Sequence, residues 1–268
     1  MNPTPPDPSG MEPVRLLLVV IAAAIGGAIN AIAGGGTLVT FPALVGLGIP
    51  AIVANATSTV ALWPGAVGSM YGYRDELGGA RDWAIRFAVP SLLGGFAGAL
   101  LLLRTPAERF DQVVPWLVLG ATLLFLVQRP LMAALRKRSG EKAVVEGDPT
   151  TRPPGAALLL FQFCVAVYGG YFGAGIGILM LAALGFMGFT NIHRMNGLKN
   201  WGGLCMNVVA AATFAFKGFV NWPVAIAMAV GALAGGYAGS RLAQRVPQGW
   251  VRGAVIVIGF VAAIWLFR

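Results

Sequence analysis

The chain has 268 residues, of which 57% are apolar and only 11% are charged. A soluble domain needs about a quarter charged residues to cover its surface, so this composition excludes a water-soluble globule. The 19 basic and 10 acidic residues give a net charge of +9, which predicts basic loops at a membrane surface and no nucleic-acid partner. Apolar stretches of about twenty residues recur along the chain and predict an all-α polytopic protein embedded in the lipid bilayer.

Hydropathy and helix breakers divide the chain into two similar sets of segments. Residues 1–13 form a polar, proline-rich tail that we predict to be disordered. The first set of apolar segments covers 14–33, 37–48, 51–72, 84–103 and 113–134. A polar linker at 135–155 separates it from the second set, which covers 156–172, 176–188, 192–216, 222–243 and 249–267. We therefore predict two membrane repeats, over residues 14–134 and 156–268.

The two sets share residues at nearly constant offsets along the chain. Gly94-Gly95-Phe96-Ala97-Gly98 matches Gly235-Gly236-Tyr237-Ala238-Gly239 at an offset of 141, which also carries Asn55 onto Asn196. Nearer the start of each set, Gly34-x-Gly36 falls on Gly173-x-Gly175 at an offset of 139. Self-similarity at a fixed period predicts an internal duplication.

One segment of each set, 37–48 or 176–188, is too short to span an apolar core of about 30 Å. Each follows a glycine-rich break, so we predict that each half begins with a helical hairpin that returns to its starting side. Three further spans then give each half an odd number of crossings. The two halves are therefore predicted to be inverted-topology repeats, as in many secondary transporters. The sequence leaves open whether the hairpins span the membrane or are re-entrant.

The basic residues predict the orientation of the chain. Lys199 apart, five of them fall on one side: Arg15, Arg104, Arg109, Lys217 and Arg268. The other thirteen fall on the side of the linker. Because cytoplasmic loops carry an excess of Lys and Arg, we expect a cytoplasmic linker and both termini outside.

The two glycine-rich breaks are the first candidate site. The candidate residues are Asn30, Gly34, Gly35, Gly36 and Thr37 in the first break and Gly173 and Gly175 in the second. Nonhelical backbone at membrane depth requires protein or a water-filled cavity around it. The helix after each break directs the positive end of its dipole toward that place, and two such ends suit an anion. Alternatively, the glycines only permit tight helix crossing.

The helix after each hairpin supplies the second group of candidate residues. They are Asn55, Thr57 and Ser58 in the first half and Asn196, Lys199 and Asn200 in the second. Lys199 lies about 10 Å along its predicted helix at 1.5 Å per residue. A charge at such depth is expensive and typical of a functional site. The alternative is a lysine that snorkels to the interface.

The acidic residues are absent from the predicted membrane segments, and none follows Asp148. Lys199 therefore has no carboxylate partner at its depth, which favours an anionic substrate. We expect no metal site, because His193 is the single histidine and the two cysteines, Cys164 and Cys205, lie in apolar segments. We also expect no cofactor and no catalytic residues, since no nucleophile with a nearby base is found.

The residues at these positions resemble a known family. Asn30-x-x-Ala33-Gly34-Gly35-Gly36-Thr37-Leu38-Val39, followed by Phe41-Pro42-Ala43-Leu44 and Ala54-Asn55-Ala56-Thr57-Ser58, is similar to the first signature of the sulfite exporter TauE/SafE family. This family belongs to the 4-toluene sulfonate uptake permease superfamily. Leu198-Lys199-Asn200 with Asn207 resembles its second-half signature. The chain departs from the family where Gly173-Ala174-Gly175-Ile176-Gly177 replaces an uninterrupted glycine run.

The resemblance implies a permease for small anions, such as sulfite, sulfoacetate or other organosulfonates, in the cytoplasmic membrane. Alternating access of the two repeats is the expected mechanism. An anion channel and a membrane subunit without transport activity are alternatives, and an intramembrane enzyme is the least favoured. The sequence leaves open the direction of transport, the coupling ion and whether the chain forms a homo-oligomer.

Overall fold

The fold is taken from a computed structural model, which describes residues 13–32, 34–77, 81–139, 153–186, 189, 191–242 and 248–268. Apart from Pro13, the predicted disordered tail lies outside the described residues. Most of the predicted linker at 135–155 lies outside them as well.

The described residues form α-helices and one 3-10 helix, with no strand among them, so the all-helical prediction is confirmed. The first half contains α1 (Pro13–Ile32), α2 (Thr37–Gly46), α3 (Ala51–Gly72), η2 (Arg74–Leu77), α4 (Arg81–Arg104) and α5 (Ala107–Ser139). The second half contains α6 (Ala156–Tyr171), α7 (Ile176–Phe186), α8 (Ile192–Phe216), α9 (Trp222–Leu242) and α10 (Gln248–Leu266). Helix α5 extends beyond the predicted segment 113–134 at both ends.

Local sequence explains several helix ends. Helix α2 stops before Gly48, whose φ of +84° breaks the helical path, and Pro50 stands at the N-cap of α3. Helix α8 begins after Asn191, whose side-chain oxygen accepts hydrogen bonds from the backbone N–H groups of His193 and Arg194 at 2.9 and 3.2 Å. Such a cap satisfies donors that the first turn leaves without partners.

Within the described residues, four helices are long and apolar enough to cross a membrane: Pro13–Ile32, Arg81–Arg104, Ala107–Val127 and Trp222–Arg241. Helices α3 and α8 have 22 and 25 residues but are not among the four. They carry the polar candidates from Asn55 to Ser58 and from Asn196 to Asn200. Large apolar side chains are exposed on the outer helices, for example Leu17 on α1 and Val257 on α10, as a lipid-facing surface requires.

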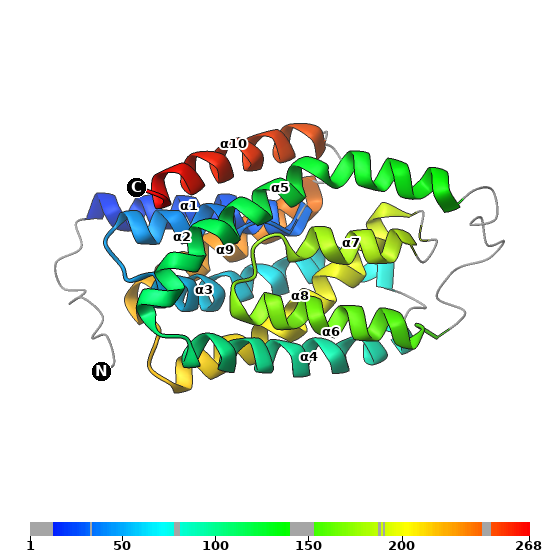
Figure 1. The fold of residues 1–268 in the computed structure, drawn as a ribbon, viewed down its shortest axis with the longest axis horizontal. Coiled ribbons are helices and arrows are strands. Elements are labelled where there is room, and N and C mark those ends of the chain that lie inside the picture. Colours follow the sequence, from blue (N-terminus) through cyan, green and yellow to red (C-terminus); the bar gives the residue numbers. More distant parts are fainter. Residues whose placement is uncertain are drawn as a thin grey trace.

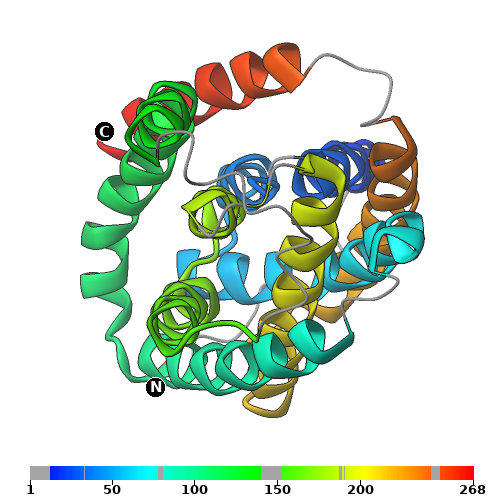
Figure 2. The ribbon, with the colours of Figure 1, turned by 90° about the vertical axis from the view of Figure 1, so that its right-hand side faces the viewer.

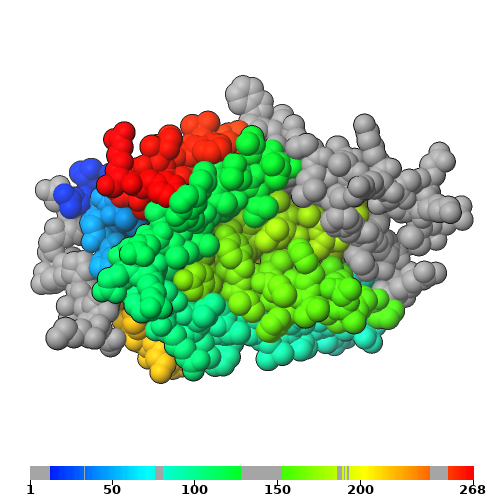
Figure 3. All heavy atoms as spheres, in the orientation of Figure 1, coloured from blue at the N-terminus to red at the C-terminus, as the bar shows by residue number. Residues whose placement is uncertain are grey.

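The helices lie roughly along the long axis of the molecule (Figure 1). Helix α1 begins and α10 ends at one end, whereas α5 ends and α6 begins at the opposite end. The short helices α2 and α7 lie toward opposite ends. Seen along the long axis, these two helices are surrounded by the longer ones (Figure 2). On the face drawn in Figure 3, α5 lies between α10 and the pair formed by α6 and α7.

Equivalent glycines in the two halves make equivalent contacts. A Cβ on Gly94 in α4 would collide with the carbonyl of Phe163 in α6, and one on Gly235 in α9 would collide with the carbonyl of Ala24 in α1. The offset from Gly94 to Gly235 is 141, and the offset from Ala24 to Phe163 is 139, as for the breaks. The pair α4 and α6 therefore packs through positions that correspond to those of the pair α9 and α1. Each pair joins one half to the other.

A second pair of glycines repeats this correspondence. A Cβ on Gly95 would meet the backbone of Met206 in α8, and one on Gly236 would meet the backbone of Gly65 in α3. Gly65 and Met206 are again 141 residues apart. Glycine at these places lets helix backbones approach closely, which is the main source of helix association in a membrane.

Candidate functional site

The two helix breaks touch each other. Gly34, with a φ of +78°, lies between α1 and α2, while Gly173 and Gly175, with φ of +82° and +77°, lie between α6 and α7. Residues with side chains rarely adopt such angles, so the sequence folds this way because these positions are glycine. A Cβ on Gly34 would also collide with the Cα of Gly177 in α7. The absence of a side chain therefore serves both the turn and the contact between the halves.

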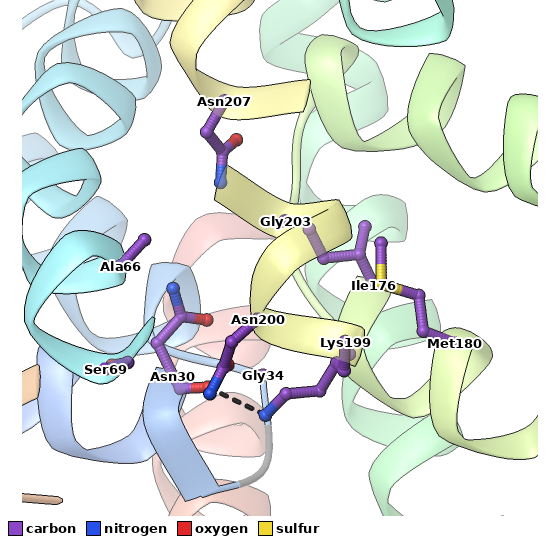
Figure 4. A pocket seen from close by; sticks show the side chains of 11 residues that line it. Asn30, Gly34, Ala66, Ser69, Ile176, Met180, Lys199, Asn200, Gly203 and Asn207 are labelled. Atoms are coloured by element: carbon purple, nitrogen blue, oxygen red, sulfur yellow. Dashed lines mark hydrogen bonds between the residues drawn. The ribbon is translucent and has the colours of Figure 1, made fainter. Parts of the chain in front are cut away.

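A small cavity lies beside this contact, and residues from both halves line it (Figure 4). The lining residues are Asn30, Gly34, Ala66, Ser69, Ile176, Gly177, Met180, Lys199, Asn200, Gly203 and Asn207. Its volume is about 20 Å³, which is room for about one water molecule. Helices α1, α3, α7 and α8 all contribute residues to it.

Lys199 is buried, with 3% of its surface exposed, and its ammonium reaches the broken end of α1. The Nζ atom donates to the backbone carbonyls of Asn30 and Ala31, at 3.0 Å each. These carbonyls belong to the last turn of α1, where the helix dipole is negative. The side chain therefore points into the protein and not toward the membrane interface, which differs from the snorkelling alternative.

Asn200 contributes an unpaired donor next to this ammonium. Its side chain is 7% exposed, and its Nδ2 atom has no hydrogen-bond partner. In Figure 4 the Asn200 amide and the Lys199 ammonium point toward the same end of α1. A buried N–H group without a partner is costly, which makes this amide the clearest place for a hydrogen-bonding ligand.

The beginning of α7 forms another wall of the cavity. Ile176 and Gly177, the first two residues of this helix, line it. The first N–H groups of a helix have no partner within it, and the dipole is positive at this end. Helix α7 is 11 residues long, and its first two residues border the same cavity as Lys199 and Asn200.

Aromatic side chains fill the region around the end of α6, the repeat equivalent of the end of α1. Phe172 packs edge-on against Phe41 of α2 and Phe110 of α5, with ring centroids 5.4 and 6.5 Å apart. All three rings are fully buried. The two sides of the break contact therefore differ, since one borders a cavity lined by polar groups and the other is packed with rings.

Comparison with known families agrees with this architecture. Residues 19–266 match the sequence model of the sulfite exporter TauE/SafE family, which is nearly the whole chain. The chain belongs to the sulfite exporter TauE/SafE family. Family membership and the apolar helices together identify a multi-pass membrane protein and support a membrane transporter.

Curated relatives of this TauE/SafE protein are similar over most of their length. The probable membrane transporter protein YfcA of Escherichia coli K12 is 29% identical over 259 residues, which are 94% of this chain and 89% of the relative. A probable membrane transporter protein of Haemophilus influenzae is 29% identical over 240 residues, 87% of each chain. The probable membrane transporter protein ORF9 of Sinorhizobium sp. is 28% identical over 254 residues, 94% of this chain and 92% of the relative. No solved structure matches.

The structure brings some of the predicted site residues of this TauE/SafE chain together at the cavity. Asn30, Gly34, Lys199 and Asn200 line it. Gly35 and Gly36 pack elsewhere: a Cβ on Gly35 would meet the ring of Phe125, and one on Gly36 would meet the carbonyl of Gly26. The other break residues, Thr37, Gly173 and Gly175, are not among the lining residues.

The predicted residues of α3 make structural contacts away from the cavity. The Asn55 amide donates to the carbonyl of Tyr171 at the end of α6, at 3.0 Å. The Ser58 hydroxyl lies 2.6 Å from that of Thr40, and the Thr57 hydroxyl accepts from the Asn221 backbone N–H at 3.0 Å. Asn196, the repeat partner of Asn55, is buried with its Oδ1 atom unpaired, but it is not a lining residue.

Sequence reasoning missed the remaining lining residues: Ala66, Ser69, Ile176, Gly177, Met180, Gly203 and Asn207. Asn207 carried a signal, because it is polar, lies in an apolar segment and belongs to the second-half signature. Ala66, Met180 and Gly203 carried none, since small or apolar residues are ordinary in a membrane helix.

Metal ligands do not gather in the described residues, where no three His, Cys, Asp or Glu side chains lie together. Cys164 is exposed and Cys205 is buried, and both are free thiols.

Proposed function

We propose that this protein is a transmembrane permease for small anions, most specifically sulfite or organosulfur anions such as sulfonates and sulfoacetate. One observation carries the proposal. The unpaired Asn200 amide, the Lys199 ammonium and the start of α7 meet at one buried cavity whose lining contains no carboxylate. All three groups present hydrogen-bond donors or positive charge.

Physical chemistry favours an anion over a cation at this place. A cation seeks oxygen ligands, whereas the unpaired group in the lining is an N–H donor. Hydrogen bonds to an ionised acceptor are about twice as strong as neutral ones, so a buried anion gains most from such donors. Sulfite and sulfonates present several acceptor oxygens on one sulfur atom, and the name of the family, sulfite exporter, supports a substrate of this kind.

Alternating access between two inverted repeats is the proposed mechanism. Support comes from the matching order of helices, the equivalent glycine contacts and the placement of α2 and α7 toward opposite ends. The cavity borders one side of the break contact while aromatic rings fill the other. An anion as large as sulfite requires the cavity to expand, which rocking one repeat against the other provides.

We place the protein in the cytoplasmic membrane with both termini outside. The excess of basic residues on the linker side supports this orientation. Two of those residues, Arg74 and Arg241, lie over the rings of Tyr71 and Tyr237, 4.4 and 5.7 Å from the ring centroids. Arginine and tyrosine together are common at the level of lipid headgroups.

The test is uptake of radiolabelled sulfite by proteoliposomes that contain the purified protein. We expect saturable uptake, and a loss of about tenfold or more in Asn200→Asp, because the new carboxylate removes a donor and repels the anion. Asn191→Asp is the matched control: it makes the same chemical change at an exposed N-cap, where Asp is equally acceptable, and should transport normally.

Three outcomes would overturn the proposal. Transport of cations alone would exclude an anion permease. Uptake that never saturates would favour the anion channel. No flux of any anion from folded protein would favour a membrane subunit without transport activity.

A further inference from the structure

The broken end of α1 has the geometry of a cation-binding site. The backbone N–H of Gly34 donates to the carbonyl of Ile29 at 3.1 Å, so it does not continue the helix by bonding to Asn30. The carbonyls of Asn30 and Ala31 instead face a single nitrogen atom of Lys199. In transporters with interrupted helices, such half-helix ends coordinate a coupling cation.

The group that occupies this place is itself a cation. The Lys199 ammonium is a compact point charge with three donors, similar to a free ammonium ion. It lies at 3.0 Å from both carbonyls and comes from the other half of the chain, 169 and 168 residues away. Its two hydrogen-bond partners are neutral carbonyls at the negative end of a helix dipole.

We propose that the carbonyls of Asn30 and Ala31 form a monovalent-cation site that Lys199 fills with its own ammonium. The attached cation then holds the end of α1 against α8, and the wild-type protein needs no inorganic cation there. The ligand class of the underlying site is ammonium, small alkylammonium or an alkali-metal ion. The unpaired amide of Asn200 remains available to the transported anion.

The other half provides an internal comparison. The end of α6 is held by the Asn55 amide, which donates to the carbonyl of Tyr171 at 3.0 Å. Both contacts join α3 or α8 of one half to the broken helix of the other, but this donor is neutral. Removing it leaves one carbonyl without a partner, whereas removing the Lys199 ammonium leaves two carbonyls and an uncompensated dipole end.

The experiment compares thermal unfolding of purified Lys199→Ala and Lys199→Met in chloride salts of equal ionic strength. The cations are ammonium, methylammonium, sodium, potassium and choline. Lys199→Ala leaves space beside the two carbonyls, whereas Lys199→Met keeps the volume of the stem without the charge. We expect both variants to melt below wild type in choline. We expect at least one small cation to raise the Tm of Lys199→Ala by about 2–4 °C over choline.

The controls separate a specific site from a general salt effect. Wild type and Lys199→Met should show the same Tm in all five salts, because their site is filled. Asn55→Ala should show no cation selectivity either, since the α6 end lacks a cation. Equal Tm values for Lys199→Ala in all salts would overturn the proposal. If folded Lys199→Ala protein is obtained only in a small-cation salt, that result supports the proposal. If folded Lys199→Ala protein is obtained in none of the salts while Lys199→Met folds, that result overturns it.

A measurement of anion uptake extends the test. This measurement rests on the proposed function, whereas the Tm experiment does not. Anion uptake by wild type should be the same in sodium, potassium and choline, while uptake by Lys199→Ala should rise severalfold in methylammonium. A cation-selective Tm without anion uptake by wild type would support the cation site and contradict the proposed permease. Anion uptake by wild type without a cation-selective Tm of Lys199→Ala would support the proposed permease and contradict the cation site.

Discussion

At the scale of single residues, glycines with similar backbone angles serve different purposes. Gly34 gives a left-handed turn and also lets the Cα of Gly177 approach, whereas Gly48 gives a left-handed turn beside open space. Lys199, the second residue of the second-half signature, holds a helix end, and Asn200 after it keeps an unpaired donor. Two adjacent residues of α8 therefore have separate roles: Lys199 holds the end of α1, and Asn200 offers a free donor.

Alanine substitution of Gly34 and Gly48 should distinguish the cost of a positive φ from the cost of a steric collision. Gly48→Ala adds only the cost of a positive φ, about 1–2 kcal/mol. Gly34→Ala adds the collision with Gly177 to the same cost, so its free energy of unfolding should fall by about 1–3 kcal/mol more. Thermal unfolding in detergent measures both variants, and equal losses would show that the breaks are less tightly packed than described.

Sulfite uptake by variants of Lys199 should depend on the shape of the new side chain and on the sign of its charge. Lys199→Arg should keep part of the flux, because a planar fork cannot replace a compact ammonium between two carbonyls. Lys199→Glu should be worse than Lys199→Ala, since it places a negative charge beside a negative helix end. Sulfite uptake normalised to folded protein measures the order, and normal uptake by Lys199→Ala would remove this side chain from the transport cycle.

At the scale of helices, the halves are joined mainly by three pairs: α1 with α9, α3 with α9, and α4 with α6. Glycines on α4 and α9 permit these close contacts, and their partners correspond by the repeat offsets. The polar helices α3 and α8 lie inside this frame and carry the donors that hold the broken helices of the opposite half. Each break is therefore fixed by the half to which it does not belong.

The equivalent glycines Gly98 and Gly239 give a test of these helix contacts. A Cβ on Gly98 would meet the carbonyl of Val167, and one on Gly239 would meet Ala28. We expect Gly98→Ala and Gly239→Ala to lower the free energy of unfolding by similar amounts, about 1–3 kcal/mol each. Gly253→Ala in α10, which has open space around it, should be neutral or slightly stabilising. Chemical unfolding in detergent compares the three variants.

At the scale of the molecule, the described helices at the two ends of the chain and those that flank its middle reach opposite ends of the bundle. Helix α1 begins and α10 ends at one end, whereas α5 ends and α6 begins at the other (Figure 1). This is the arrangement that an odd number of crossings in each half requires.

The orientation of the chain can be measured directly. A cysteine or reporter at Gly140 should be labelled from the cytoplasm, and one at either terminus from outside. Position 140 lies outside the described residues, so labelling tests the charge rule and not a contact. Two cytoplasmic termini with a cytoplasmic Gly140 would contradict the odd number of crossings.

The sequence alone determined features that depend on local physics. Apolar runs predict helices in a membrane because each buried backbone group must be satisfied within its own segment. The breaks at Gly34 and Gly173 were predictable because a positive φ is a property of the residue itself, and both have it. The family followed from the same short stretches, and it is confirmed over residues 19–266.

Tertiary structure alone decided which polar groups are paired. Asn55 and Asn200 looked alike in sequence, yet one donates to Tyr171 and the other has an Nδ2 atom without a partner. Lys199 was predicted to face an anion or the interface, and the sequence did not indicate the two carbonyls, 168 and 169 residues away, that its ammonium reaches. Such contacts depend on how helices from the two halves pack, and no local pattern records that packing, because a polar side chain in a membrane takes whatever partner its neighbours present.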